Sequence, residues 1–186
     1  MCTVKRLSIS ITVLLLVLLS SASSAQTSSI TLENRVKAAY LYNILKFTQW
    51  QKFKSAEVSS PIHLCVLGRD SIAEALEPVT KKTAQGRSIT LEIISTFDAK
   101  KRCQVLVISA KRHHKNLFKV AENAGVLTLS SHEYFAVDGG MIGFVIRNGK
   151  VHMEINISAL RQAGIQMSSK LLEISTLIKS DADQKK

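Results

Sequence analysis

Apolar residues recur at three- and four-residue spacing between Ile30 and Trp50, starting with Leu32. This period predicts a long amphipathic helix, and Thr31 stands where its N-cap is expected. From Pro61 onward the pattern changes, and short apolar runs alternate with helical segments. Alternation of strands and helices is the signature of an α/β domain.

Four mostly apolar runs predict the strands of a mainly parallel sheet: 62–68, 88–94, 103–109 and 125–130. The third run is continuous and rich in β-branched residues, as expected for a strand covered on both faces. A helix capped by Asp70 or Ser71 is predicted over 72–79, and another over 111–123. Crossovers of this length make the strands they connect parallel.

The dipeptide Asn148-Gly149 separates two further strand-like runs, 141–147 and 150–155. This is a strong signal for a two-residue β-hairpin, so we expect the sheet to end in an antiparallel pair. Asn156 or Ser158 is expected to cap a helix that ends at Gly164. The last helix is expected over 170–179, started by Ser168 or Ser169. The fold class predicted is a single α/β domain with a mixed, mostly parallel sheet flanked by helices.

The N-terminus has the three-part pattern of a secretory signal peptide. Lys5 and Arg6 precede the apolar run 7–19, which small polar residues follow up to Ala25. The run has 13 residues, whereas about 20 are needed to cross a bilayer as a helix. Cleavage before Gln26 is therefore favoured over an uncleaved anchor, and we expect an exported protein that works outside the cytoplasm.

Removal of residues 1–25 from the 186-residue chain leaves 161, enough for one domain with its own core. We expect this domain to span 26–180, followed by a polar tail at 181–186. Loss of two basic residues lowers the net charge from +11 to +9. Export excludes nucleic acid as a partner, which leaves an anionic membrane surface, a cell-wall polymer, an acidic protein face or a solvated surface without a target.

Two cysteines, Cys65 and Cys103, remain after Cys2 leaves with the signal peptide. An even number in an oxidising compartment favours a disulfide, and two buried free thiols are the alternative. Neither cysteine has the Cys-x-x-Cys arrangement of a redox site or the paired spacing of a zinc site. A bridge between them would be structural.

The sequence offers little for catalysis, and no cofactor or metal is expected. The glycines of 139–143 precede a strand, whereas a phosphate-binding loop opens a helix, so tight-turn glycines are the better interpretation. The histidines have no metal-type spacing. Glu154, with Arg161 beyond it, is better explained by a salt bridge or a helix start than by a general base.

With these residues in place, the chain closely resembles the YfiR family of small periplasmic proteins. The resemblance extends from about Glu33 to Ile178. It rests on the ordered set of the following segments: 36–43 with Lys46, Phe47 and Trp50; 65–68; 103–109; 125–128; 139–144; and 154–156 leading to 168–172.

The resemblance implies regulation and not catalysis. It implies a periplasmic repressor that holds an inner-membrane diguanylate cyclase inactive through the periplasmic sensor domain of that cyclase, and so limits cyclic di-GMP and biofilm formation. An outer-membrane lipoprotein that sequesters the repressor is a further implied partner, and a homodimer is a third. One family disulfide matches Cys65 and Cys103. A second pair has no counterpart, because Val145, Ile146 and His152 occupy that region.

We place the partner-binding face around Glu154, Asn156 and Arg161, because polar residues cluster there beside an apolar segment. The alternative for this segment is that it closes the core. A rival function is a periplasmic small-ligand sensor. Such a site would lie at the carboxyl ends of the parallel strands, near Gly68, Ser109 and Ser130.

Overall fold

The computed structural model describes residues 30–53, 60–68, 70–100, 102–109 and 115–179. The predicted signal peptide and polar tail lie outside these residues. The described chain begins with helix α2 (Leu32–Phe47), and the Thr31 hydroxyl accepts a hydrogen bond from the Asn34 N–H at 3.2 Å, which confirms the predicted cap. No helix in these ranges is long and apolar enough to cross a bilayer.

The predicted continuation of the first helix to Trp50 is wrong. Residues 48–50 form strand β1 (Thr48–Trp50), which pairs antiparallel with β9 (Ile165–Met167). Thr48 and Trp50 are buried and Gln49 is exposed, which is the alternation of a strand with one covered face. Pairing with a distant segment therefore overrides the local helical period.

Eight strands of the described chain form the main sheet, in the order β10, β8, β7, β6, β5, β2, β4, β3. Their bounds are β2 Ile62–Leu67, β3 Thr83–Ala84, β4 Arg87–Ile94, β5 Val105–Ile108, β6 Leu127–Ser130, β7 Ile142–Arg147, β8 Lys150–Asn156 and β10 Thr176–Ile178. The four neighbouring pairs from β4 through β2, β5 and β6 to β7 are parallel, whereas β3 pairs antiparallel with β4. The predicted mostly parallel α/β sheet is confirmed.

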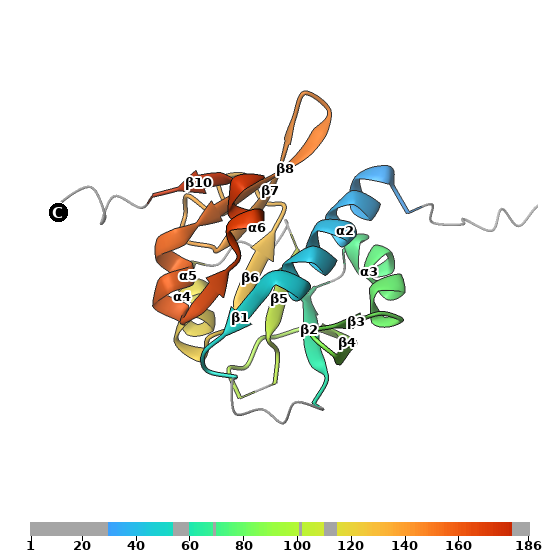
Figure 1. The fold of residues 1–186 in the computed structure, drawn as a ribbon, viewed down its shortest axis with the longest axis vertical. Coiled ribbons are helices and arrows are strands. Elements are labelled where there is room, and N and C mark those ends of the chain that lie inside the picture. The colour runs from blue at the N-terminus through green and yellow to red at the C-terminus, as the bar shows by residue number, and fades with distance from the viewer. Residues whose placement is uncertain (1–29, 54–59, 69, 101, 110–114, 180–186) are drawn as a thin grey trace, which may run out of the picture.

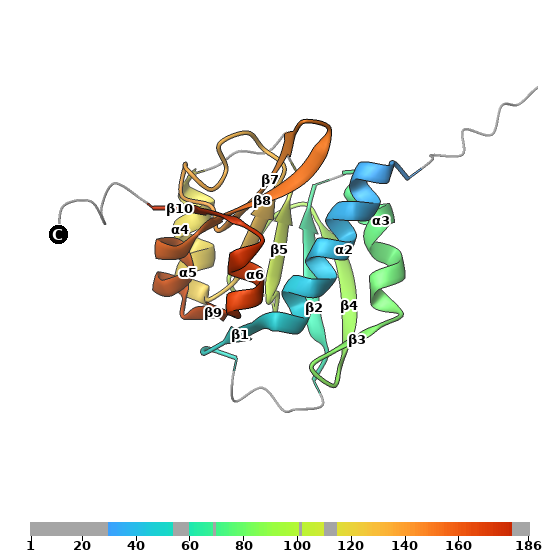
Figure 2. The ribbon, with the colours of Figure 1, turned by 45° about the horizontal axis from the view of Figure 1, so that its top comes forward.

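The sheet is doubly wound around its central strands. The chain passes from β2 through α3 (Ile72–Thr80) to β4 on one side, and later through α4 (Lys115–Ala124) from β5 to β6 on the other. Helices α2 and α3 pack on one face of the sheet, with the larger apolar cluster. Helix α4 and the smaller apolar cluster, which includes both cysteines, lie on the opposite face (Figure 2).

The predicted hairpin is confirmed. Strands β7 and β8 pair antiparallel over six residue pairs. Asn148 and Gly149 between them have φ angles of 51° and 71°, the left-handed conformation that a tight two-residue turn requires. Helix α5 (Ile157–Ala163) then begins directly at the end of β8.

The C-terminal segment differs from the prediction of one helix over 170–179. Helix α6 (Ser169–Glu173) is short, and β10 follows it and pairs parallel with β8. The sheet therefore does not end in the hairpin, because β10 lies beyond it along the inner half of β8 (Figure 1). The local sequence favours a helix, but the ladder hydrogen bonds offered by β8 favour a strand for these three residues.

Candidate functional site

A disulfide joins Cys65 on β2 to Cys103 just before β5, with Cα atoms 5.8 Å apart. This confirms the predicted bridge over the alternative of two free thiols. The strands are neighbours in the sheet, which brings the two cysteines together. Both side chains are buried in the core cluster under α4. Such a disulfide is typical of proteins that fold in an oxidising compartment.

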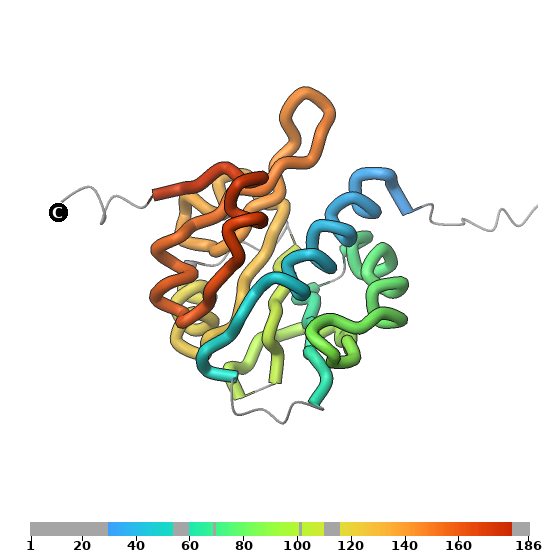
Figure 3. Tube along the Cα trace, in the orientation of Figure 1, coloured from blue at the N-terminus to red at the C-terminus, as the bar shows by residue number. Residues whose placement is uncertain are grey.

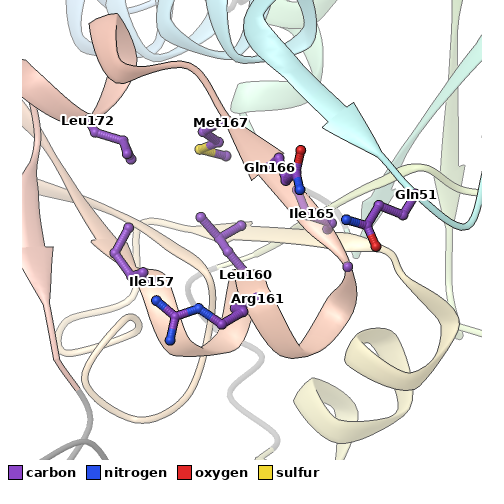
Figure 4. A pocket seen from close by; sticks show the side chains of 9 residues that line it. Gln51, Ile157, Leu160, Arg161, Ile165, Gln166, Met167 and Leu172 are labelled. Carbon is purple, nitrogen blue, oxygen red and sulfur yellow. The ribbon is translucent and has the colours of Figure 1, made fainter.

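Arg161 lies on α5 beside a groove of about 370 Å³, which we call the Arg161 groove. The groove lies between α5, β9 and α6. Its lining residues are Gln51, Ile157, Leu160, Arg161, Gly164, Ile165, Gln166, Met167 and Leu172 (Figure 4).

The Arg161 groove has an apolar floor and a polar rim. Leu160 and Ile165 are buried and Met167 is half-buried, whereas Arg161 and Gln166 are exposed. Protein–protein interfaces commonly have an apolar core and a polar rim, and arginine is enriched among the residues that contribute most to binding. The groove can therefore take apolar side chains of a partner and pair with an acidic group beside them.

The backbone around Gly164 shapes the groove. Gly164 ends α5 with a φ of 72°, and its N–H donates to the carbonyl oxygens of Leu160 and Arg161. Its own carbonyl accepts a hydrogen bond from the Gln51 N–H at 3.0 Å, so the end of β1 is held against the end of α5. The left-handed conformation at this position favours glycine.

Asn156 is a structural residue of α5. Its Oδ1 accepts the Ala159 N–H at 3.0 Å as the N-cap, and its Nδ2 donates to the Ala136 carbonyl at 2.9 Å. The side chain is only 3% exposed. The sequence prediction that Asn156 or Ser158 caps the helix is thus resolved in favour of Asn156.

Glu154 is also buried, and it forms an ion pair with Arg147 of β7 and not with Arg161. Glu154 is therefore better explained as one half of a salt bridge than as a general base, and its partner is Arg147. The period-two alternation of the hairpin places both side chains on one face, and this signal could have identified Arg147. Of the three predicted partner-binding residues, Arg161 alone has an exposed side chain.

A second groove, of about 390 Å³, lies beside the hairpin, and we call it the hairpin groove. It is lined by Glu33 and Lys37 of α2, by 131–134 except His132, by 144–147 of β7, and by Glu154. The Lys37 ammonium is buried and paired with Glu33. Tyr134 is exposed at a φ of 60°, and its hydroxyl hydrogen bond to Glu133 raises the pKa of Tyr134.

The residues of the alternative ligand-sensor site are engaged within the fold. The Ser130 hydroxyl donates to the Ile108 carbonyl at 2.8 Å and accepts the His132 N–H. The backbone N–H of Gly68 donates to Ile94, and that of Ser109 to Leu67. These contacts hold the carboxyl ends of the strands together.

The comparisons with known proteins agree with this architecture. A solved structure of a conserved domain protein from Vibrio cholerae O1 biovar El Tor strain N16961 superimposes with a TM-score of 0.50 at 13% sequence identity. The match covers 77% of this chain and 60% of that one, which shows a shared fold. The comparison with curated proteins found no match. The family model described as YfiR/HmsC-like matches residues 34–176, so this chain belongs to the YfiR/HmsC-like family.

Proposed function

We propose that this protein is a periplasmic repressor of an inner-membrane diguanylate cyclase. The observation that carries the proposal is the family match over 34–176. The disulfide supports a compartment outside the cytoplasm. The protein limits cyclic di-GMP synthesis, and with it biofilm formation, from the other side of the membrane. An outer-membrane lipoprotein that binds the repressor relieves this inhibition.

Repression works by differential binding. The protein binds the inactive state of the cyclase's periplasmic sensor domain more tightly than the active state and so shifts the population toward the inactive one. A signal that weakens this contact then raises cyclic di-GMP without entering the cytoplasm. No catalytic step by this chain is required.

The Arg161 groove is the proposed face for the sensor domain. Arg161 supplies a charged donor at the rim of an apolar floor, and this combination is common at binding hot spots. Glu154 and Asn156 contribute indirectly, because Asn156 fixes the start of α5 and Glu154 fixes the hairpin before it. Both are therefore positioning residues in this proposal.

The test is the variant Arg161→Glu, with Lys100→Glu as a control that makes the same change of charge at another exposed site. We expect Arg161→Glu to weaken capture of the cyclase from envelope extract by roughly 30-fold, equivalent to about 2 kcal/mol. Cellular cyclic di-GMP should rise, and the thermal unfolding midpoint should stay unchanged.

Two different outcomes would contradict the proposed binding face and the proposed function. Full repression and normal capture with Arg161→Glu would exclude the groove as the binding face. An unchanged level of cyclic di-GMP after deletion of the whole gene, with no cyclase captured by the wild-type protein, would refute the proposed function itself.

A further inference from the structure

Strand β4 has an open edge on the side away from β2. Strand β3 is the last strand of the main sheet in the described chain, and it pairs with β4 only at Arg87 and Ser88. Along 89–94 the outer edge of β4 has no strand partner in the described residues. Strands β3 and β4, drawn in green, lie on the side of the molecule away from the red C-terminal segment (Figure 3). An open edge of this length is a template for another strand.

The register shows which backbone groups face the open edge. The carbonyl oxygen of Ile94 accepts the Gly68 N–H at 2.9 Å, so the backbone of Ile94 points toward β2. The direction of the N–H and C=O groups alternates along a strand, so those of Ile89, Leu91 and Ile93 point away from β2. The edge therefore offers a backbone donor and a backbone acceptor at every second residue.

The two faces of β4 beside this edge differ. Ile89 and Leu91 pack with the larger apolar cluster, and Ile93, which alternates onto the same face, is 57% exposed. Thr90 and Glu92 alternate onto the other face and are exposed. A strand added beside β4 would therefore meet apolar side chains on one face and polar ones on the other.

The edge carries little that would prevent strand addition. Residues 89–94 contain neither proline nor lysine, and Glu92 is their one charged side chain. None of them has a positive φ angle. Strand edges that stay unpaired are usually protected by lysine, proline or a bulge. The edge of β4 is therefore suited to pairing with a partner strand.

The charges around this edge are acidic, although the whole chain is basic. Every charged side chain in 70–80 and in 88–98 is acidic: Asp70, Glu74, Glu77, Glu92 and Asp98. Glu74 and Glu77 are exposed on α3, which packs on β4. A partner strand with basic residues is thus complementary in charge to this part of the surface.

A pocket of about 230 Å³ lies on the polar face beside the edge. Thr90 and Glu92 of β4 line it, together with Arg102 from the segment before β5, on the other side of β2. Neighbouring strands are about 4.8 Å apart, so an added strand would lie next to Glu92 and about 14 Å from β5. A basic side chain of that strand can therefore pair with Glu92, while its aliphatic part lies over Thr90.

We propose that the edge of β4 binds an extended segment of another envelope protein, in which apolar residues alternate with lysine or arginine. The backbone of that segment pairs with β4, its apolar side chains cover Ile93, and a basic side chain pairs with Glu92. In this mode of recognition the backbone hydrogen bonds supply affinity, and alternate side chains supply specificity. The edge is separate from the Arg161 groove, so the proposal stands independently of the proposed function.

The first test measures charge recognition with a short fluorescent peptide of alternating valine and lysine, read by anisotropy at physiological salt. Glu92→Lys should weaken binding about tenfold, because it places like charges together. Glu173→Lys makes the same change at an exposed site on α6 and should leave binding unchanged. A peptide with threonine in place of lysine should also bind about tenfold more weakly. Equal binding by the wild-type protein and Glu92→Lys would contradict the assigned charge pair.

The second test locates the backbone pairing. Ile93→Pro removes an N–H that faces outward and leaves the ladder with β2 intact, so it should weaken binding about tenfold or more. Ile93→Val keeps this N–H and should bind normally. In the wild-type protein, the peptide should slow amide hydrogen exchange at Leu91 and Ile93, which is a readout that needs no variant to fold.

Three results would overturn the proposal. The first is a wild-type protein that does not bind the valine–lysine peptide. The second is binding without slower exchange at Leu91 and Ile93, and the third is a folded Ile93→Pro variant that binds as tightly as Ile93→Val. In the last two cases the peptide must bind elsewhere on the molecule.

Discussion

His63 lies on β2, where its environment favours the neutral ring. Its Nδ1 is 2.8 Å from the Thr90 hydroxyl. Burial lowers the pKa of His63 below its usual value, and the positive charges of Arg102 and Arg87 lower it further, while Glu92 acts in the opposite direction. Protonation of this side chain therefore opposes folding.

We predict that His63 makes the fold less stable in mild acid. The pKa of His63 is lower in the folded state than the ordinary histidine value, so the unfolded chain binds the proton more readily as the pH falls through about 6.5. The contribution of neutral His63 to the free energy of unfolding is fully present above that pH. It is lost progressively as the pH falls toward the lowered pKa of the folded state. Chemical denaturation at a series of pH values should show this loss, and His63→Gln should reduce it. An identical pH dependence in both proteins would contradict the prediction.

At the residue scale the sequence identified Arg161 and the two cysteines as positions of interest. It did not identify the partner of Glu154, because an ion pair across a hairpin depends on register and not on proximity along the chain. It also did not identify Gln51, which reaches the Arg161 groove through the pairing of β1 with β9. Long-range pairings of this kind have no local signal.

Helix α5 is the element on which the Arg161 groove depends, and Asn156 holds its first turn. We predict that Asn156→Ala destabilises the protein by about 2 kcal/mol, because it removes the cap and leaves the buried Ala136 carbonyl without its donor. Denaturant unfolding measures the effect. Asn156→Asp keeps the capping oxygen and loses the donor, so a loss equal to that of Asn156→Ala would show that the cap contributes nothing.

At the scale of elements, the strands that cross the core were the most predictable. Runs such as 103–109 are apolar throughout because both faces of the sheet are covered, and this leaves a clear pattern. The short peripheral strands β1 and β10 were predicted as helix. Each has only three residues and pairs with a segment that is distant in the sequence: β1 with β9, and β10 with β8. The local sequence pattern carries no signal of these pairings and therefore favours a helix.

At the scale of the whole molecule, the disulfide joins the two central strands at a separation of 38 residues. We predict that its removal costs about 3 to 4 kcal/mol of unfolding free energy, from the loop entropy that the unfolded chain regains. Guanidinium unfolding with and without reductant measures this. A Cys65→Ala, Cys103→Ala double variant should be equally destabilised and insensitive to reductant. Unchanged stability on full reduction would contradict the prediction.

The same bridge has a consequence for damage in the cell envelope. The ring that it closes contains α3, β3 and β4, which is the entire β4 side of the sheet. If a protease cuts the chain once anywhere between residues 66 and 102, the two fragments stay covalently attached through the central strands. A nicked molecule can therefore remain one particle, and reduction after cleavage is what would release its two parts.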